Sequence, residues 1–167
     1  NTPSVPNQLI LETEEVSLHM KREDLLHPEI SGNKFRKLKY NLLEAQKQKK
    51  EQLLTFGGAF SNHIAATAAA GRDFGFKTIG VIRGEELGAD PERTLQENQT
   101  LRYAHACGME FEFVSRQDYR RKDSAEFLGQ LKTKFGDFYL IPEGGTNELA
   151  VKGCEEILTK EDTGFEV

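Results

Sequence analysis

Hydrophobic and polar positions in this chain follow two periods, one typical of strands and one typical of helices. Val16, Leu18 and Met20 alternate with polar residues, which predicts one or two short strands between residues 9 and 20. Between residues 33 and about 50, apolar side chains recur every three or four positions on an otherwise polar segment. This second pattern predicts a helix with a polar outer face.

From residue 52 onward, predicted strands and helices alternate. The strands are expected at residues 52–56, 77–82, 110–114 and 137–141. Helices are expected at residues 61–75, 91–107 and 147 to about 159, and residues 115–134 are expected to be mostly helical. This order predicts βαβ units and therefore an α/β fold, an open parallel sheet with helices on both faces. Residues 142–146 are expected to form a turn, and residues 165–167 read as the start of a further strand.

The composition narrows the class of protein. The 167 residues carry a formal net charge of -5, which argues against a general nucleic-acid binder. No apolar stretch approaches the ~20 residues that span a bilayer, so no membrane partner is expected. Cys107 and Cys154 have neither the spacing of metal ligands nor that of a disulfide framework. We therefore expect no metal site and take a reduced, cytoplasmic setting as the default.

Lys34 is the first candidate for chemistry, in the segment Ser-Gly-Asn-Lys-Phe-Arg-Lys of residues 31–37. An amine that reacts with an aldehyde must be unprotonated, whereas a free lysine has a pKa of ~10.4. Burial or a cationic neighbour lowers that pKa. Lys37 lies three positions further on, and so on the same side of the predicted helix. Alone, the segment also fits a solvated surface lysine; together with the glycine-rich turn at residues 57–63 it predicts a lysine that holds an aldehyde cofactor.

A glycine-rich turn, Gly-Gly-Ala-Phe-Ser-Asn-His at residues 57–63, joins a predicted strand to a predicted helix. Ser61 or Asn62 is a suitable N-cap, and the free N–H groups of a helix start attract a carboxylate or a phosphate. Alone, this pattern also fits an ordinary capped helix, and a lone His63 is more often packed or solvated than catalytic. Residues 142–147, Pro-Glu-Gly-Gly-Thr-Asn, repeat the order of strand, glycine turn and capped helix.

Together and in this order, these segments resemble a known family of enzymes. Residues 31–38 are similar to the cofactor-lysine motif of pyridoxal-phosphate enzymes of the tryptophan-synthase-β fold type, also called fold type II. More narrowly, they resemble the 1-aminocyclopropane-1-carboxylate deaminase and D-cysteine desulfhydrase family. Residues 57–63 resemble the substrate loop of that family, and residues 141–153 resemble its Gly-Gly-Ser-Asn segment with the helix that follows. The resemblance runs from about Leu9 to the end of the chain.

The resemblance implies a role for each matching residue. Lys34 would bind the cofactor, pyridoxal 5'-phosphate, covalently and later move the Cα proton. Asn62 would hydrogen-bond the phenolic oxygen of the cofactor, and Lys37 would contact its phosphate. Ser61, Asn62 and His63 would hold the substrate carboxylate, and Ser61 would assist proton transfer. The implied reaction converts a small amino acid, 1-aminocyclopropane-1-carboxylate or D-cysteine, into ammonia and a 2-oxo acid, with sulfide as well in the second case.

The resemblance also implies that the chain is the N-terminal half of a longer enzyme that is a homodimer. Residues 1–37 would begin the large domain with the cofactor lysine, residues 38–141 would form the small α/β domain, and residues 142–167 would return to the large domain. The family's glycine-rich phosphate loop and its pyridine-nitrogen partner are missing from these 167 residues, so we expect them alone to be inactive.

Two alternatives stay open at this point. The first is another enzyme of the same fold type, a β-replacing synthase or a dehydratase. The second is a truncated module that binds a ligand or a partner without catalysis.

Overall fold

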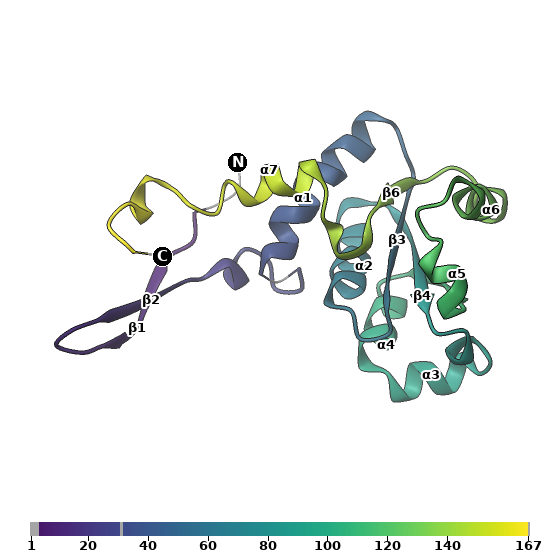
Figure 1. Ribbon diagram of the computed structural model, residues 1–167, viewed down its shortest axis with the longest axis horizontal. Helices are drawn as coiled ribbons and strands as arrows, with labels where there is room; N and C mark the ends of the chain where they lie inside the picture. The colour runs from purple at the N-terminus through teal and green to yellow at the C-terminus, as the bar shows by residue number, and fades with distance from the viewer. Residues whose placement is uncertain (1–3, 31, 167) are drawn as a thin grey trace.

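A computed structural model describes residues 4–30 and 32–166 of the chain. Ser31, the first residue of the lysine segment, lies outside the described residues, and so do Val167 and residues 1–3. The described residues form an α/β unit from which a narrow arm extends (Figure 1).

Strands and helices alternate through most of the described chain. The strands are β1 (Asn7–Glu12), β2 (Ser17–Lys21), β3 (Gln52–Gly58), β4 (Lys77–Arg83), β5 (Met109–Val114) and β6 (Tyr139–Ile141). The α-helices are α1 (Asn33–Lys47), α2 (Asn62–Phe74), α3 (Pro91–Glu97), α4 (Gln99–Ala106), α5 (Arg116–Arg120), α6 (Ala125–Phe135) and α7 (Glu148–Cys154). Short 3-10 helices are η1 (Glu23–Leu25), η2 (Glu85–Gly88), η3 (Glu143–Gly145) and η4 (Lys160–Asp162).

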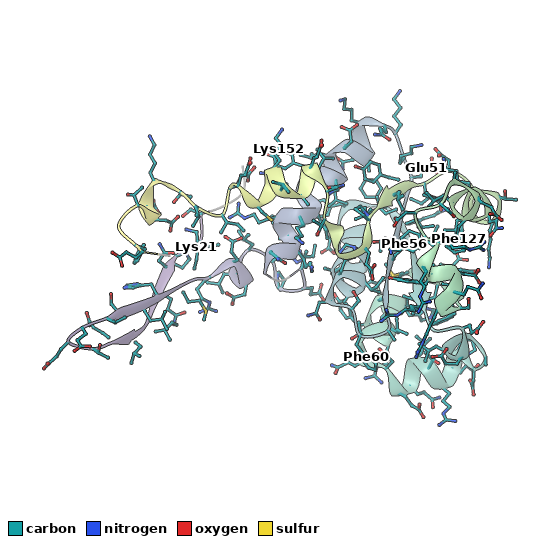
Figure 2. All side chains as sticks on the ribbon, in the orientation of Figure 1. Lys21, Glu51, Phe56, Phe60, Phe127 and Lys152 are labelled. Atoms are coloured by element: carbon teal, nitrogen blue, oxygen red, sulfur yellow. The ribbon has the colours of Figure 1, made fainter. Side chains whose placement is uncertain are left out.

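The last four strands form one parallel sheet in the order β5-β4-β3-β6, which confirms the predicted fold class. Successive side chains of a strand point to opposite faces. Leu53 therefore packs in a core with α1 and α2, whereas Leu54 and Phe56 pack in another with α5 and α6. Phe56 and Phe127 of α6 lie close together on that second face (Figure 2). Both faces of the sheet are thus covered, as expected of parallel strands.

Helix α2 owes its close packing to its small residues. A Cβ atom on Gly71 would lie 2.2 Å from Cγ2 of Thr78 in β4, so only glycine permits this approach of helix and strand. Ser61 is the N-cap of α2, and Gly75 ends the helix with a φ of 77°. Both ends agree with the boundaries expected from the sequence.

The single helix expected at residues 91–107 is wrong, because the structure has α3 and α4 there. The two helices are separated at Asn98, whose backbone is extended and whose side chain accepts a hydrogen bond from the Leu101 N–H at 2.9 Å. Asn98 is only 5% exposed, so its amide serves as a buried cap for α4.

Residues 115–134 are mostly helical, as expected, and divide into α5 and α6 because Ser124 caps α6 by accepting a hydrogen bond from the Phe127 N–H. The last helix and the last strand are corrected. Helix α7 ends at Cys154, earlier than expected. Residues 165 and 166 are not in a strand, and residue 167 lies outside the described part.

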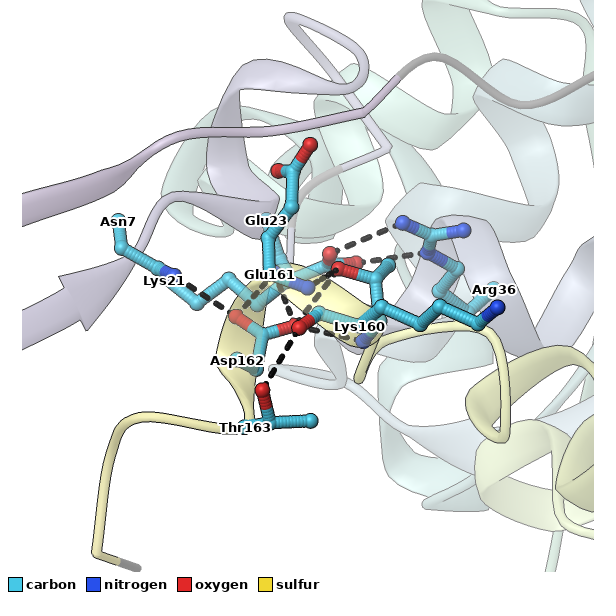
Figure 3. Close-up of polar contacts among 9 residues, drawn as sticks. Asn7, Lys21, Glu23, Arg36, Lys160, Glu161, Asp162 and Thr163 are labelled. Carbon is cyan, nitrogen blue, oxygen red and sulfur yellow. Dashed lines mark hydrogen bonds and ion pairs between the residues drawn. The ribbon is translucent and has the colours of Figure 1, made fainter.

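The arm is an antiparallel hairpin of β1 and β2 that is tied to the C-terminal segment through Asp162. Nζ of Lys21 lies 2.8 Å from both carboxylate oxygens of Asp162, and Nδ2 of Asn7 donates to the same group at 2.7 Å (Figure 3). These hydrogen bonds hold the pKa of Asp162 well below its usual range. Nearby, Nε of Arg36 in α1 donates to Glu23 at 2.8 Å. The two contacts tie Lys21 and Glu23, which precede the lysine motif, to the C-terminal segment and to α1.

Candidate functional site

Both glycine turns lie at one edge of the sheet, where β3 and β6 end. These strands are neighbours, with Thr55 paired to Ile141, so the turn after β3 and the turn after β6 are side by side. The carboxyl ends of parallel strands are where open α/β sheets bind ligands. The expected site residues gather at this edge.

Lys34 is half-buried at the start of α1. Its amine faces the turn after β6, residues 142–147, which we call the second turn; the turn of residues 57–63 is the first. Its Nζ lies 3.5 Å from the carbonyl oxygen of Gly144. Burial lowers the pKa of Lys34, the positive charge of Lys37 lowers it further, and Cys154 opposes the shift. A larger share of the amine is therefore unprotonated than in a free lysine, as the sequence led us to expect.

Lys37 joins Lys34 in holding the second turn. Its Nζ donates to Oγ1 of Thr146 at 2.8 Å and lies 3.5 Å from the same Gly144 oxygen. Gly144 and Gly145 both have left-handed backbones, with φ of 68° and 71°. The carbonyl of Gly144 is thereby turned toward the two amines, a conformation that other residues adopt only with strain.

His63 has its imidazole turned into the protein, where it is 2% exposed. Nε2 lies 2.8 Å from Oγ1 of Thr55, and that hydroxyl donates to the carbonyl of Ile141 at 2.9 Å. Because the hydroxyl proton is used in this way, Nε2 of His63 must carry the proton and donate to Thr55. Nδ1 is then an acceptor, buried and without a hydrogen-bond partner among the described residues.

The charge state of His63 follows from the same surroundings. Burial lowers the pKa of His63 to about 3, and the charges of Lys34 and Lys37 add to the shift. The imidazole is therefore neutral at ordinary pH. Its ring packs against Gly145, where an added Cβ would stand 3.0 Å from Cε1 of the ring. In this arrangement the ring supports the turn of residues 142–147 and is turned away from solvent.

Ser61 and Asn62 begin α2 on the outer side of the same edge. Oγ of Ser61 accepts a hydrogen bond from the Ile64 N–H at 3.4 Å, and Asn62 is exposed. Ser61 borders an open cleft of about 960 Å³, together with Gly58, Tyr119 and Glu143. Figure 2 shows Phe60 of this turn projecting outward, and its side chain is 80% exposed.

The sequence did not point to two residues that shape the site. Thr55 holds His63 and the end of β6, and its signal was a single hydroxyl among the apolar residues of β3. Asn41 of α1 is fully buried and pairs with Asn147, the N-cap of α7, through hydrogen bonds of 2.7 and 3.1 Å. A polar residue on the inward face of a predicted helix would have been the clue.

The cysteines, metal ligands and membrane helices considered from the sequence can also be compared with the structure. Cys107 is buried and Cys154 is half-buried, and both are free thiols. Within residues 4–30 and 32–166, no three His, Cys, Asp or Glu side chains gather as metal ligands would. No helix in the same part of the chain is both long enough and apolar enough to cross a membrane.

Known proteins share both the sequence and the fold. The chain is 32% identical over 160 residues to a bifunctional D-cysteine desulfhydrase/1-aminocyclopropane-1-carboxylate deaminase, mitochondrial, of Arabidopsis thaliana, covering 93% of this chain and 38% of the relative. It is 37% identical over 139 residues to a putative 1-aminocyclopropane-1-carboxylate deaminase of Thermotoga maritima, covering 82% and 42%. A crystal structure of an ACC deaminase homologue superposes with a TM-score of 0.71 at 26% identity, covering 99% of this chain and 50% of that one.

The chain is a relative of the deaminase and desulfhydrase family. This confirms the resemblance drawn from residues 31–38, 57–63 and 141–153. No family model matches the sequence. The chain spans about two fifths of the length of the curated deaminase and desulfhydrase relatives it matches. A hydrogen sulfide-producing enzyme of Fusobacterium nucleatum, with a TM-score of 0.56 at 14% identity, shares the fold.

Proposed function

We propose that this chain is part of a pyridoxal-phosphate-dependent deaminase or desulfhydrase that acts on a small amino acid and releases ammonia and a 2-oxo acid. The observation that carries the proposal is the amine of Lys34, half-buried and with a lowered pKa, beside two glycine turns at the carboxyl edge of the sheet. The names of the relatives support the reaction class. They do not favour a β-replacing synthase, a dehydratase or a module without catalysis.

The residues at the site fit the chemistry of the cofactor. Lys34 would offer an amine to bind its aldehyde, and Lys37 would offer a positive charge to its phosphate. The cofactor, once bound, would supply an electron sink for bond cleavage beside the amino group of the substrate. Lys34 would then be the group that holds and moves the proton at Cα.

Substrate binding is proposed at the start of α2. The first N–H groups of a helix have no partner within the helix, and they attract a carboxylate. Ser61 and the exposed Asn62 would contact that carboxylate with their side chains, and Asn62 would also reach the phenolic oxygen of the cofactor. Because the ring of His63 points inward, we propose that His63 contributes its backbone N–H.

The arrangement of the whole enzyme is proposed on the same grounds. Residues 1–37 and 142–167 would belong to a large domain and residues 38–141 to a small one, with the first boundary falling inside α1. The complete enzyme would be a homodimer. We also propose a cytoplasmic location, which would differ from that of the Arabidopsis relative, whose name says mitochondrial.

The test uses the full-length natural protein and its visible absorption spectrum. Lys34→Ala should abolish the visible band of the lysine-bound cofactor together with turnover. Lys47→Ala, at the exposed end of the same helix, is the matched control and should keep both. A visible band that survives Lys34→Ala would show that another amine carries the cofactor, and the assignment would be wrong.

A further inference from the structure

The cleft beside Ser61 has a second wall that carries three arginines. Arg83 ends β4, while Arg116 and Arg120 lie four residues apart on α5, and all three border the cleft. Residues four apart share one side of a helix, so the two arginines of α5 stand together. Within residues 4–30 and 32–166, none of the three guanidinium groups takes part in an ion pair or a hydrogen bond.

The carboxylates of the same cleft do not balance these charges. Glu97 pairs with Arg93 at 2.8 Å. Glu143 lies 3.4 Å from Nζ of Lys122 and accepts a hydrogen bond from the Tyr119 hydroxyl at 2.7 Å. This leaves Glu86 against the three arginines, so the cleft is locally positive in a protein whose net charge is -5.

Arg83 is positioned between the two walls. Its Cζ lies 5.6 Å from the centroid of the Tyr119 ring, a cation–π distance that holds the guanidinium over a buried aromatic. On the other side, Nη2 of Arg83 lies 3.9 Å from where a Cβ of Gly58 would stand. The guanidinium thus extends across to the first glycine turn, beside the start of α2.

We propose that this arginine cleft binds the second acidic group of a small dianionic ligand whose first acidic group lies at the start of α2, beside Ser61. Guanidinium groups bind carboxylates in a two-pronged geometry, and a helix start binds a carboxylate through its N–H groups. The cleft of about 960 Å³ is at the upper end of the range for small-molecule sites and exceeds what a three-carbon amino acid fills. That this ligand is a substrate with an acidic side chain rests on the proposed function; anion binding itself does not.

The first experiment measures binding to the full-length protein by calorimetry, with glutarate as the dianion and butyrate as the matched monoanion. At low salt we expect glutarate to bind about tenfold more tightly, since it alone reaches both walls. Raising the ionic strength should weaken glutarate more than butyrate, because an exposed charge cluster is screened by salt. Equal affinities of the two acids would overturn the proposal.

Arginine variants locate the effect. The double variant Arg116→Gln with Arg120→Gln should weaken glutarate about tenfold and leave butyrate unchanged. Arg93→Gln is the matched control, because that exposed arginine is already paired with Glu97 and does not border the cleft. An equal loss in the control would mean that the effect is general electrostatics, which also overturns the proposal. All of these arginines are exposed, so the variants should fold.

Turnover then separates the two sources of the anion. If the ligand is a substrate, the double variant lowers kcat/KM about tenfold for an amino acid with an acidic side chain and leaves a neutral one unchanged. If a free dianion occupies the cleft, both amino acids respond to added glutarate and neither responds to the double variant in its absence. The visible band in Lys34→Ala tests the proposed function separately, so a failure there leaves the glutarate result standing.

Discussion

The two glycine turns at the sheet edge have similar sequences and different surroundings. At the end of β3, Gly57 makes room for the helix that follows, because a Cβ there would lie 2.5 Å from Cγ1 of Ile64. After β6, Gly144 and Gly145 provide left-handed backbone, held by two lysine amines on one residue and by the His63 ring on the other. The same residue type thus serves close packing in one turn and backbone direction in the other.

This difference suggests separate roles for the two turns, ligand binding for the first and positioning of Lys34 for the second. The first turn stays open, with Ser61 bordering the cleft and Phe60 exposed. The second turn is held from two sides and fixes where the amine of Lys34 lies. Substitutions around the second turn should therefore cost stability, whereas those around the first should cost activity. We expect the following losses in the free energy of unfolding of the full-length protein, ordered from the largest to the smallest.

Protonation of His63 at low pH should cause the largest loss in the free energy of unfolding. Its folded pKa is about 3, against about 6.5 in the unfolded chain, so between these values the unfolded state binds a proton that the native state does not. This contribution to stability is complete above pH 6.5 and falls by up to about 1.4 kcal/mol per pH unit below it, or roughly 3 kcal/mol in all by pH 4.5.

Urea unfolding from pH 7.5 to 4.5 measures this loss. His63→Gln removes the titrating group, so its curve should be flatter than that of the unsubstituted protein. His105→Gln, on an exposed part of α4, is the control. Parallel curves for His63→Gln and the unsubstituted protein would show that the ring is not held neutral.

Asn147→Ala should have the next largest effect, because it removes a helix cap and a buried pair at once. Asn147 accepts from the Ala150 N–H at 2.9 Å and exchanges hydrogen bonds with the fully buried Asn41. Losing the cap costs about 1 kcal/mol, and a poorly satisfied buried amide costs about as much again, for a total of about 2 kcal/mol. The midpoint of thermal unfolding measures it, and turnover per folded molecule should change little.

Gly145→Ala should cost about 1.5 kcal/mol, from its left-handed backbone and its contact with His63. Gly144→Ala is a matched control, since it has the same kind of backbone, and among residues 4–30 and 32–166 the atom nearest to the added Cβ, chain neighbours aside, is Oγ1 of Thr146 at 4.0 Å. The difference between the two variants in urea unfolding isolates the contact with the ring. A larger loss for Gly144→Ala would mean that His63 does not support this turn.

Most of the fold could be predicted from the sequence, because hydrophobic spacing reports directly on which face of an element is buried. The parallel sheet and the ends of α2 follow from it. The division into α3 and α4 could not, because Asn98 ends one helix and caps the next with a side chain whose burial the spacing does not reveal. Local capping competes with helical periodicity there, and capping decides.

The site divides in the same way. Placement of Lys34 and Lys37 on one side of a helix followed from their spacing, and the structure brings both to Gly144. The inward direction of His63 did not follow, because it depends on Thr55, a residue of a neighbouring element. The resemblance implied that His63 helps to hold the substrate carboxylate. Tertiary packing, which buries the imidazole, decides which part of the residue can do so.

Ser61→Ala should cost the least stability and reverse the pattern set by Asn147→Ala. The hydrogen bond from the Ile64 N–H to Oγ of Ser61 is long, at 3.4 Å, so its loss should cost about 0.5 kcal/mol, at the low end for an N-cap. Turnover should fall on the order of a hundredfold if the hydroxyl moves protons. Stability and kcat measured on both cap variants therefore give opposite rankings if the first turn serves the ligand and the second holds the lysine. An unchanged kcat in Ser61→Ala would show that Ser61 is only a helix cap. The proposal that the first turn serves the ligand would then be wrong.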